Sequence, residues 1–307
     1  MLHVLRDTTG RALHKVATVQ PRPDEPPRAL CGLCGWSETA DPPGDHTEAR
    51  SLAREHLHRP AEWPVFHRGR ASLTGGRRVN ADHSAVLVDD ACGEVTAWAV
   101  ADGIGDTPEA AHAARVAAST AVRALYGSRL APADAILAAR DELTRRAPDG
   151  DAVMIVAAAR AGGDGYELAW VGDCRGYELR DGHLIQLTTD HTVAEETRAW
   201  LREAYSQHEE PPGWYAHHLP RWEHIVTTTV ATATTADIGR ATTGDQTTRL
   251  LLTTDGVHKQ VPHDTLATLV STASSVRAGA HRIARAGIEH GGQDNATALL
   301  VDPVVVP

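Results

Sequence analysis

Three aspartates placed at the ends of apolar runs constrain the fold of this chain more than any other feature. They are Asp102-Gly103 after residues 94–101, Asp255-Gly256 after residues 250–254, and Asp294-Asn295 just before residues 296–301. Each puts a short carboxylate where a strand stops, and a following glycine lets the backbone approach a ligand with its carbonyl free. Hard divalent cations bind carboxylate, carbonyl and water oxygens. A single Asp-Gly pair is typical of a hairpin turn, but the set of three predicts a metal site assembled from several strand ends.

Six short motifs surround these aspartates. In chain order they are Arg77-Arg78-Val79-Asn80-Ala81-Asp82, Val100-Ala101-Asp102-Gly103-Ile104-Gly105, Val171-Gly172-Asp173-Cys174-Arg175-Gly176-Tyr177, Leu187-Thr188-Thr189-Asp190-His191-Thr192, Leu251-Leu252-Thr253-Thr254-Asp255-Gly256-Val257 and Gly292-Gln293-Asp294-Asn295-Ala296-Thr297. In kind, order and spacing they resemble the motifs of the PPM family of metal-dependent serine/threonine phosphatases, also called protein phosphatase 2C. The resemblance covers residues 64–303.

Hydrophobic patterning in this part of the chain predicts an α+β domain. Strands are expected at residues 94–101, 152–159, 166–171, 176–187, 248–254 and 295–301, the fourth forming a hairpin with Asp181-Gly182 at its tip. Helices are expected from an N-cap at Thr107 to Tyr126, over 132–146, and over 264–290 with Gly279 as a point of breakage. The resemblance implies a four-layer αββα sandwich, in which helix pairs flank two antiparallel sheets and the metal site lies at one end.

The resemblance also implies roles for individual residues at a centre of two Mn²⁺ or Mg²⁺ ions. The expected catalytic residues are the metal-binding aspartates Asp102, Asp255 and Asp294. Asp102 would bridge both ions with the Gly103 carbonyl on one of them, Asp255 and Asp294 would bind the other, and Asp82 would support the cluster through water. Arg77 aligns with the phosphate-binding arginine, where a planar guanidinium suits a phosphate dianion. A shift of one residue would give that role to Arg78 instead.

Several positions depart from the family pattern. Ala81 stands where an acidic or amide residue is usual, a loss that predicts metal affinity weaker by about 10- to 100-fold. Ile104 replaces a common histidine or methionine, and Gly150-Asp151-Ala152 replaces Gly-Thr-Thr. Asp173 keeps one ligand of the family's looser third ion, but Lys259 occupies the position of the second, and its ammonium would repel a cation. The sequence therefore predicts an intact pair of ions and a third, weaker site that is impaired.

Residues 1–62 are expected to form an extension separate from the domain at 63–303, and residues 304–307 a short tail. Residues 1–30 are polar, and the prolines within 21–27 favour a stiff extended segment that does not contribute to a hydrophobic core. Cys31 and Cys34 form a knuckle typical of zinc sites. A helix is expected to begin after Asp45; His56 near its end is the best third ligand, and His58 could be the fourth if the helix loosens there. This predicts a small zinc-finger-like module over residues 31–58. The alternative is a redox-silent cysteine pair in a tail.

Composition excludes some classes of function. Lys+Arg 30 against Asp+Glu 40 leaves a net charge of −10, so no nucleic-acid footprint is present. Four cysteines in no framework pattern favour a reducing compartment. The absence of long apolar runs and of a signal-peptide core predicts no membrane association and a cytoplasmic protein.

The expected function is hydrolysis of phosphoserine or phosphothreonine in phosphorylated proteins. One rival is a PPM-fold pseudophosphatase that binds phosphopeptides without turnover, favoured by Ala81 and Lys259. Another is a zinc-stabilised adaptor in which residues 31–58 recruit a protein partner. Residues 195–224, rich in aromatic and histidine side chains, fall in the family's variable flap. They would either dock a peptide around the phosphoresidue or close a local hydrophobic cluster. No pattern indicates an oligomeric state.

Overall fold

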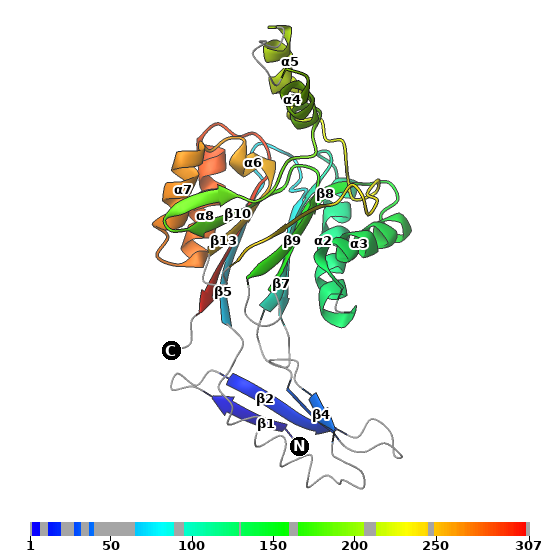
Figure 1. Cartoon of the computed structure of the whole chain (residues 1–307), viewed down its shortest axis with the longest axis vertical. Coiled ribbons are helices and arrows are strands. Elements are labelled where there is room, and N and C mark those ends of the chain that lie inside the picture. The colour runs from blue at the N-terminus through cyan, green and yellow to red at the C-terminus, as the bar shows by residue number, and fades with distance from the viewer. Residues whose placement is uncertain are drawn as a thin grey trace.

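The computed structural model describes residues 65–88, 95–128, 130–159, 165–205, 213–244 and 249–304, together with four N-terminal strands. The main body contains two five-stranded antiparallel sheets (Figure 1). The first has the order β11 (His183–Gln186), β10 (Arg175–Arg180), β13 (Arg249–Thr253), β14 (Ala296–Val304) and β5 (Val65–Leu73). The second has the order β12 (Gly239–Thr242), β9 (Tyr166–Val171), β8 (Ala152–Ala159), β7 (Val95–Gly103) and β6 (Asp82–Val88).

Helices cover the outer face of each sheet. Helices α2 (Pro108–Ser128) and α3 (Pro132–Arg146) pack on the second sheet, and α7 (His263–Ser271) and α8 (Val276–Glu289) pack on the first (Figure 1). The expected αββα sandwich is therefore confirmed. The short helix α6 (Asp255–His258) lies at one end, where α4 (Val193–Ala204) and α5 (Trp214–Trp222) project beyond the sheets.

Strand β7 shows why the central strands read as continuous apolar runs. Trp98 and Val100 belong to the core between the two sheets, whereas Ala99 and Ala101 belong to the core beneath α2 and α3. Successive side chains in a strand point to opposite faces, and here both faces are buried. Small alanines on the helix side let α2 lie close to the sheet. Together with a third core beneath α7 and α8, these cores fix the strand ends that carry the site.

Local predictions can be compared directly with this structure. The hairpin is confirmed, because Arg180 pairs with His183 and both Asp181 (φ 52°) and Gly182 (φ 80°) have positive φ. The expected break at Gly279 is wrong. The helix is interrupted before Ser275, whose side chain accepts the Ala278 N–H as an N-cap.

Gly279 instead lies inside α8, where it permits close packing. A Cβ at this position would lie 2.7 Å from the Ala273 Cβ and 2.8 Å from the Leu300 Cδ2. The glycine therefore brings α8 close to β14 rather than ending the helix.

The N-terminal region contains strands that the sequence did not reveal. β1 (Leu2–Arg6), β2 (Ala12–Val19), β3 (Arg28–Cys31) and β4 (Ser37–Thr39) form an antiparallel sheet in that order. Cys31 ends β3, and the other three predicted zinc ligands, Cys34, His56 and His58, lie outside the described residues. The zinc module therefore remains a prediction. In the described parts of the chain, no helix is both long and apolar enough to cross a membrane.

Candidate functional site

Strand pairing brings the first two aspartates of the site together. Asp82 opens β6, Asp102 is the second-last residue of β7, and the two are directly opposite one another in the antiparallel register. Opposed residues on one face of a sheet have Cβ atoms about 5 Å apart. The second sheet therefore contributes two neighbouring carboxylates at a single end of the sandwich.

The first sheet contributes the other carboxylates at the same end. Asp255 begins α6 immediately after β13, Asp294 lies two residues before β14, and these two strands are paired. Asp173 lies in the turn between β9 and β10. A pocket of about 180 Å³ opens here, and its lining includes Arg77, Asp102, Gly103, Ile104, Asp173, Asp255 and Asp294.

The glycines of the two Asp-Gly pairs serve the packing of the protein on itself. A Cβ at Gly103 would lie 2.2 Å from the Ala110 carbonyl oxygen of α2, and a Cβ at Gly256 would lie 2.0 Å from the Asn295 carbonyl oxygen. Neither pair forms a hairpin turn, because Gly103 ends β7 and Gly256 is in the first turn of α6. Glycine is thus required for the close backbone packing that gathers the aspartates.

On the Asp82–Asp102 side of the site, two carboxyl groups are buried together in a way that disfavours their charged forms. Burial, reinforced by Asp255 and Asp294, raises the pKa of Asp82 to about 7, although a 2.8 Å hydrogen bond from the Thr254 hydroxyl to its Oδ2 opposes the shift. Burial and the charge of Asp82 also raise the pKa of Asp102 well above its ordinary value. Carboxylates buried together disfavour the charged form unless a cation joins them.

Two carboxylate oxygens, one on each side of the centre, show that the site fits divalent cations. Asp82 Oδ1 and Asp255 Oδ1 are buried and have no hydrogen-bond partner, and an unpaired buried oxygen is costly. Hard-oxygen ligands of this kind suit Mg²⁺ or Mn²⁺. Among the described residues, no three acidic, histidine or cysteine side chains already converge as ligands of one ion. The donor set therefore fits the pair of ions, although the ligand shell is not closed in this geometry.

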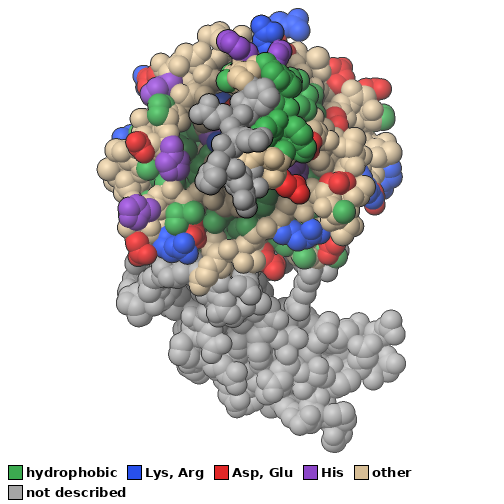
Figure 2. Space-filling model, turned by 45° about the horizontal axis from the view of Figure 1, so that its top comes forward, with side chains coloured by type: hydrophobic (Ala, Val, Ile, Leu, Met, Phe, Trp, Pro, Cys, Tyr) green, Lys and Arg blue, Asp and Glu red, His purple; other side chains and the backbone are tan. Residues whose placement is uncertain are grey.

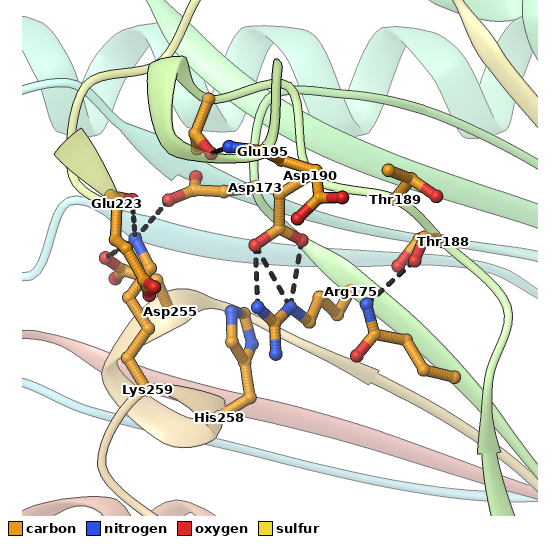
Figure 3. Close-up of polar contacts among 12 residues, drawn as sticks. Asp173, Arg175, Thr188, Thr189, Asp190, Glu195, Glu223, Asp255, His258 and Lys259 are labelled. Carbon is orange, nitrogen blue, oxygen red and sulfur yellow. Dashed lines mark hydrogen bonds and ion pairs between the residues drawn. The ribbon is translucent and has the colours of Figure 1, made fainter. Parts of the chain in front are cut away.

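Lys259 neutralises the other side of the site (Figure 3). Its Nζ donates to Asp173 Oδ2 at 2.5 Å, to Asp255 Oδ2 at 3.1 Å and to the Glu223 carbonyl at 2.9 Å. Burial works to lower the pKa of Lys259, but the charges of Asp255 and Asp173 outweigh it and raise that pKa. Burial and Asp255 keep the pKa of Asp173 above its ordinary value, although Lys259 lowers it. These residues do not fit a third metal ion, because an ammonium already fills the space between the carboxylates.

The two adjacent arginines point to different places. Arg77 lines the pocket, and its Nη2 donates to Asp294 Oδ2 at 2.6 Å, which helps to raise the pKa of Arg77. Arg78 instead contacts Asp106, and its side chain is 83% exposed. The structure therefore places Arg77, and not Arg78, at the site.

Two further residues hold the loop that carries Arg77. Asp106 accepts the backbone N–H groups of Arg78 and Val79 at 3.0 and 2.9 Å. The Asn295 amide donates to the carbonyls of Thr74 and Val79, and its oxygen accepts the Ala81 N–H at 2.7 Å. Sequence reasoning missed both roles. The only signal was their position, Asn295 directly after Asp294 and Asp106 just before an N-cap.

An arginine–aspartate pair lies beside the Lys259 cluster in Figure 3. Arg175 donates to both carboxylate oxygens of Asp190, through Nε and Nη2. His258, beside this pair in the view, is buried and bonds Thr253 through Nδ1 at 2.9 Å. Burial and the charge of Arg175 hold the pKa of His258 well below its ordinary value. The neutral histidine and the paired arginine support the floor of the site.

The flap consists of α4 and α5, whose aromatic side chains contact one another. Trp214 stacks on Tyr215 with ring centroids 3.7 Å apart, and Trp200 lies 6.1 Å from Tyr215. Trp200 and Trp214 are nevertheless each 51% exposed, and Figure 2 shows hydrophobic side chains gathered at this end of the molecule. Both expected features, a local cluster and an exposed aromatic surface, are therefore present together.

Comparisons with known proteins agree with this geometry. No family model matches the chain. The "Serine/threonine protein phosphatase PstP" of Mycobacterium tuberculosis is 32% identical over 141 residues, which are 45% of this chain and 25% of that protein. The "Serine/threonine phosphatase stp" of Listeria welshimeri is 31% identical over 136 residues, 44% of this chain and 50% of that protein. The chain thus spans a quarter to a half of the length of the curated relatives it matches.

The fold is shared with solved phosphatases. The crystal structure of the PstP catalytic domain "in complex with 2 Manganese ions" has a TM-score of 0.59, 23% sequence identity, and covers 79% of this chain and 100% of that one. The sandwich is therefore the PPM-type serine/threonine phosphatase fold, with its aspartates at the same end as the pocket. Partial sequence relatives and fold neighbours together support the resemblance seen in the six motifs.

Proposed function

We propose that this chain is a metal-dependent phosphoprotein phosphatase, which hydrolyses phosphoserine or phosphothreonine with two Mn²⁺ or Mg²⁺ ions. The observation that carries the proposal is one pocket lined by the buried Asp102 together with Asp255, Asp294 and the guanidinium of Arg77. Its supports are the fold, the partial relatives named as serine/threonine phosphatases, and a fold neighbour that holds two manganese ions.

Each residue of the pocket would have a separate task. Asp102, Asp255 and Asp294 would hold the ions, with the Gly103 carbonyl adding a neutral oxygen, and Asp82 would act behind them. When bound, the ions would supply an activated water and neutralise charge on the phosphoryl group. Arg77, oriented by Asp294, would bind non-bridging phosphate oxygens through its remaining N–H groups. No protein nucleophile is needed in this scheme.

Hydrolysis of a phosphothreonine peptide tests the proposal. We expect turnover that requires Mn²⁺ or Mg²⁺, stops with EDTA, and falls by at least about 10³-fold in Asp102→Asn, equivalent to about 4 kcal/mol of transition-state stabilisation. Asp264→Asn is the matched control, since Asp264 is exposed on α7 and should retain full activity. Metal-independent turnover, or full activity in Asp102→Asn, would refute the assignment of the site.

A pseudophosphatase of the same fold is the second candidate, favoured by the protein's own cation at Asp173 and Asp255. It predicts that the phosphothreonine peptide binds, through Arg77, without turnover at millimolar Mn²⁺. Binding measured by calorimetry beside the turnover assay separates the two candidates.

For the N-terminal extension we propose a structural zinc ion bound by Cys31, Cys34, His56 and His58. The ion would stabilise a surface for a protein partner. Elemental analysis of protein purified without chelator should find about one zinc per chain, lost when residues 1–62 are removed. A zinc-free full-length protein would favour a tail without a metal.

A further inference from the structure

An unusual basic residue for this chain, Lys259, contacts two aspartates that line the pocket. Of the 30 basic residues, only Lys15 and Lys259 are lysines. All other cations in the domain are arginines, yet the most buried basic position in the acidic centre is a lysine, with 7% of its side chain exposed. A buried lysine whose ammonium contacts acidic side chains cannot be explained by a need for solubility at the protein surface.

The environment of the Lys259 ammonium is made of oxygen alone. Its three N–H groups have three acceptors within 3.1 Å, two carboxylates and one carbonyl, contributed by Asp173, Asp255 and Glu223. An ammonium is a compact point charge with three donors, whereas a guanidinium is a planar fork. Carboxylate and carbonyl oxygens are also the ligands a hard cation takes. The side chain thus sits where an ion would find its ligands.

The position is fixed by chain segments from three parts of the fold. Asp255 and Lys259 are four residues apart on α6 and its C-cap, a spacing that places them on one face. Asp173 comes from the β9–β10 turn. Glu223 caps α5 at the end of the flap, and its carboxylate pairs with Arg198 of α4. Lys259 therefore joins the acidic centre directly to the base of the flap.

We propose that Lys259 is a built-in cation that permanently replaces a divalent ion between Asp173 and Asp255, so that the protein binds two ions and not three. This inference rests on the proposed function, because it concerns the same centre. The ammonium supplies a positive charge that orients Asp255. It also holds the Glu223 carbonyl at the end of α5, and it does both at any metal concentration. The carboxylate oxygens that remain without a partner, Asp82 Oδ1 and Asp255 Oδ1, are left for the ions from solution.

Counting bound Mn²⁺ tests this directly. Equilibrium dialysis of the full chain should give two ions at saturation, and Lys259→Asp, which replaces the cation by a further carboxylate, should give three. Lys259→Arg should remain at two, because the charge is kept. Three ions on the natural protein would overturn the inference while leaving the proposed function standing. No bound Mn²⁺ at all would instead refute the proposed function, and the inference with it.

A second measurement needs no variant. Acetylation by acetic anhydride, followed by mass spectrometry of the Lys259 peptide, reports whether the ammonium stays buried. We expect the native protein to react at Lys259 at least ten-fold more slowly than the unfolded chain, and millimolar Mn²⁺ to leave that rate unchanged. Faster reaction in Mn²⁺ would mean that an ion displaces the ammonium, which contradicts the proposal.

Discussion

The two sides of the acidic centre handle the same problem differently. On one side Asp82 and Asp102 are buried opposite each other, and among the described residues neither forms an ion pair with a lysine or arginine. On the other side Asp173 and Asp255 share the ammonium of Lys259. Buried negative charge is costly unless it is paired. Sensitivity to added metal should therefore be greater on the Asp82–Asp102 side, since Lys259 already offsets part of the charge of Asp173 and Asp255.

Replacing one aspartate from each side should give the largest contrast. We expect the loss of at least about 10³-fold in kcat for Asp102→Asn, but less than about 10-fold for Asp173→Asn, because Lys259 keeps Asp255 as a partner. The measurement is turnover of a phosphothreonine peptide at saturating Mn²⁺. Equal losses in the two variants would show that both sides hold essential ions.

The arginines give a smaller contrast within the phosphate-binding edge. Arg77→Ala should lower kcat/KM by about 10- to 100-fold, which corresponds to one charge-assisted hydrogen-bonding group of about 1.5–3 kcal/mol. Arg78→Ala should change it by less than about three-fold, because its side chain lies at the surface against Asp106. A larger effect in Arg78→Ala than in Arg77→Ala would reverse the assignment.

The pH dependence of stability without metal should expose the uncompensated side. Asp82 has a pKa of about 7 in the fold against an ordinary 3.8, so the unfolded chain loses this proton first and stability falls as the pH rises from about 4 to about 7. In EDTA we expect a melting temperature several degrees higher at about pH 5 than at about pH 8.

Mn²⁺ should then stabilise the protein more at the higher pH, because the charged carboxylates bind it. Asp82→Asn serves as the matched control and should weaken the dependence in EDTA, leaving the part due to Asp102, whose pKa is also raised. A melting temperature that rises with pH in EDTA would show that burial beside other carboxylates does not raise the pKa of Asp82.

Strands with two buried faces were the easiest part of the fold to predict from sequence. Residues 152–159 and 166–171 agree with β8 and β9 at both ends, since their apolar runs are continuous. Strand β5 was missed because its charged Arg68 and Arg70 interrupt the pattern. The strands of residues 1–31 were missed because this segment is polar on average, although β1 and β2 themselves contain several Leu, Val and Ala side chains.

The three expected catalytic aspartates of the site could be identified from sequence because each stands directly next to, or within two residues of, an apolar run that predicts a strand. The resemblance already placed Lys259 beside Asp173. Its contact with Asp255 was not predicted, since residues 255–258 were not recognised as helical, and helical spacing brings residues 255 and 259 together. The glycine contacts depend on which distant backbone lies nearby. Such facts belong to tertiary structure and carry no local signal.

The side chain of Asn295 has a consequence for how a substrate is received. It ties three backbone groups of the segment 74–81, and Asp106 ties two more, around the arginine that faces the pocket. Ordering a mobile loop costs about 1–2 kcal/mol of backbone conformational entropy for each residue fixed. Because that cost is met during folding, a phosphate group arriving at Arg77 has only the guanidinium left to immobilise, and more of its interaction energy remains as affinity.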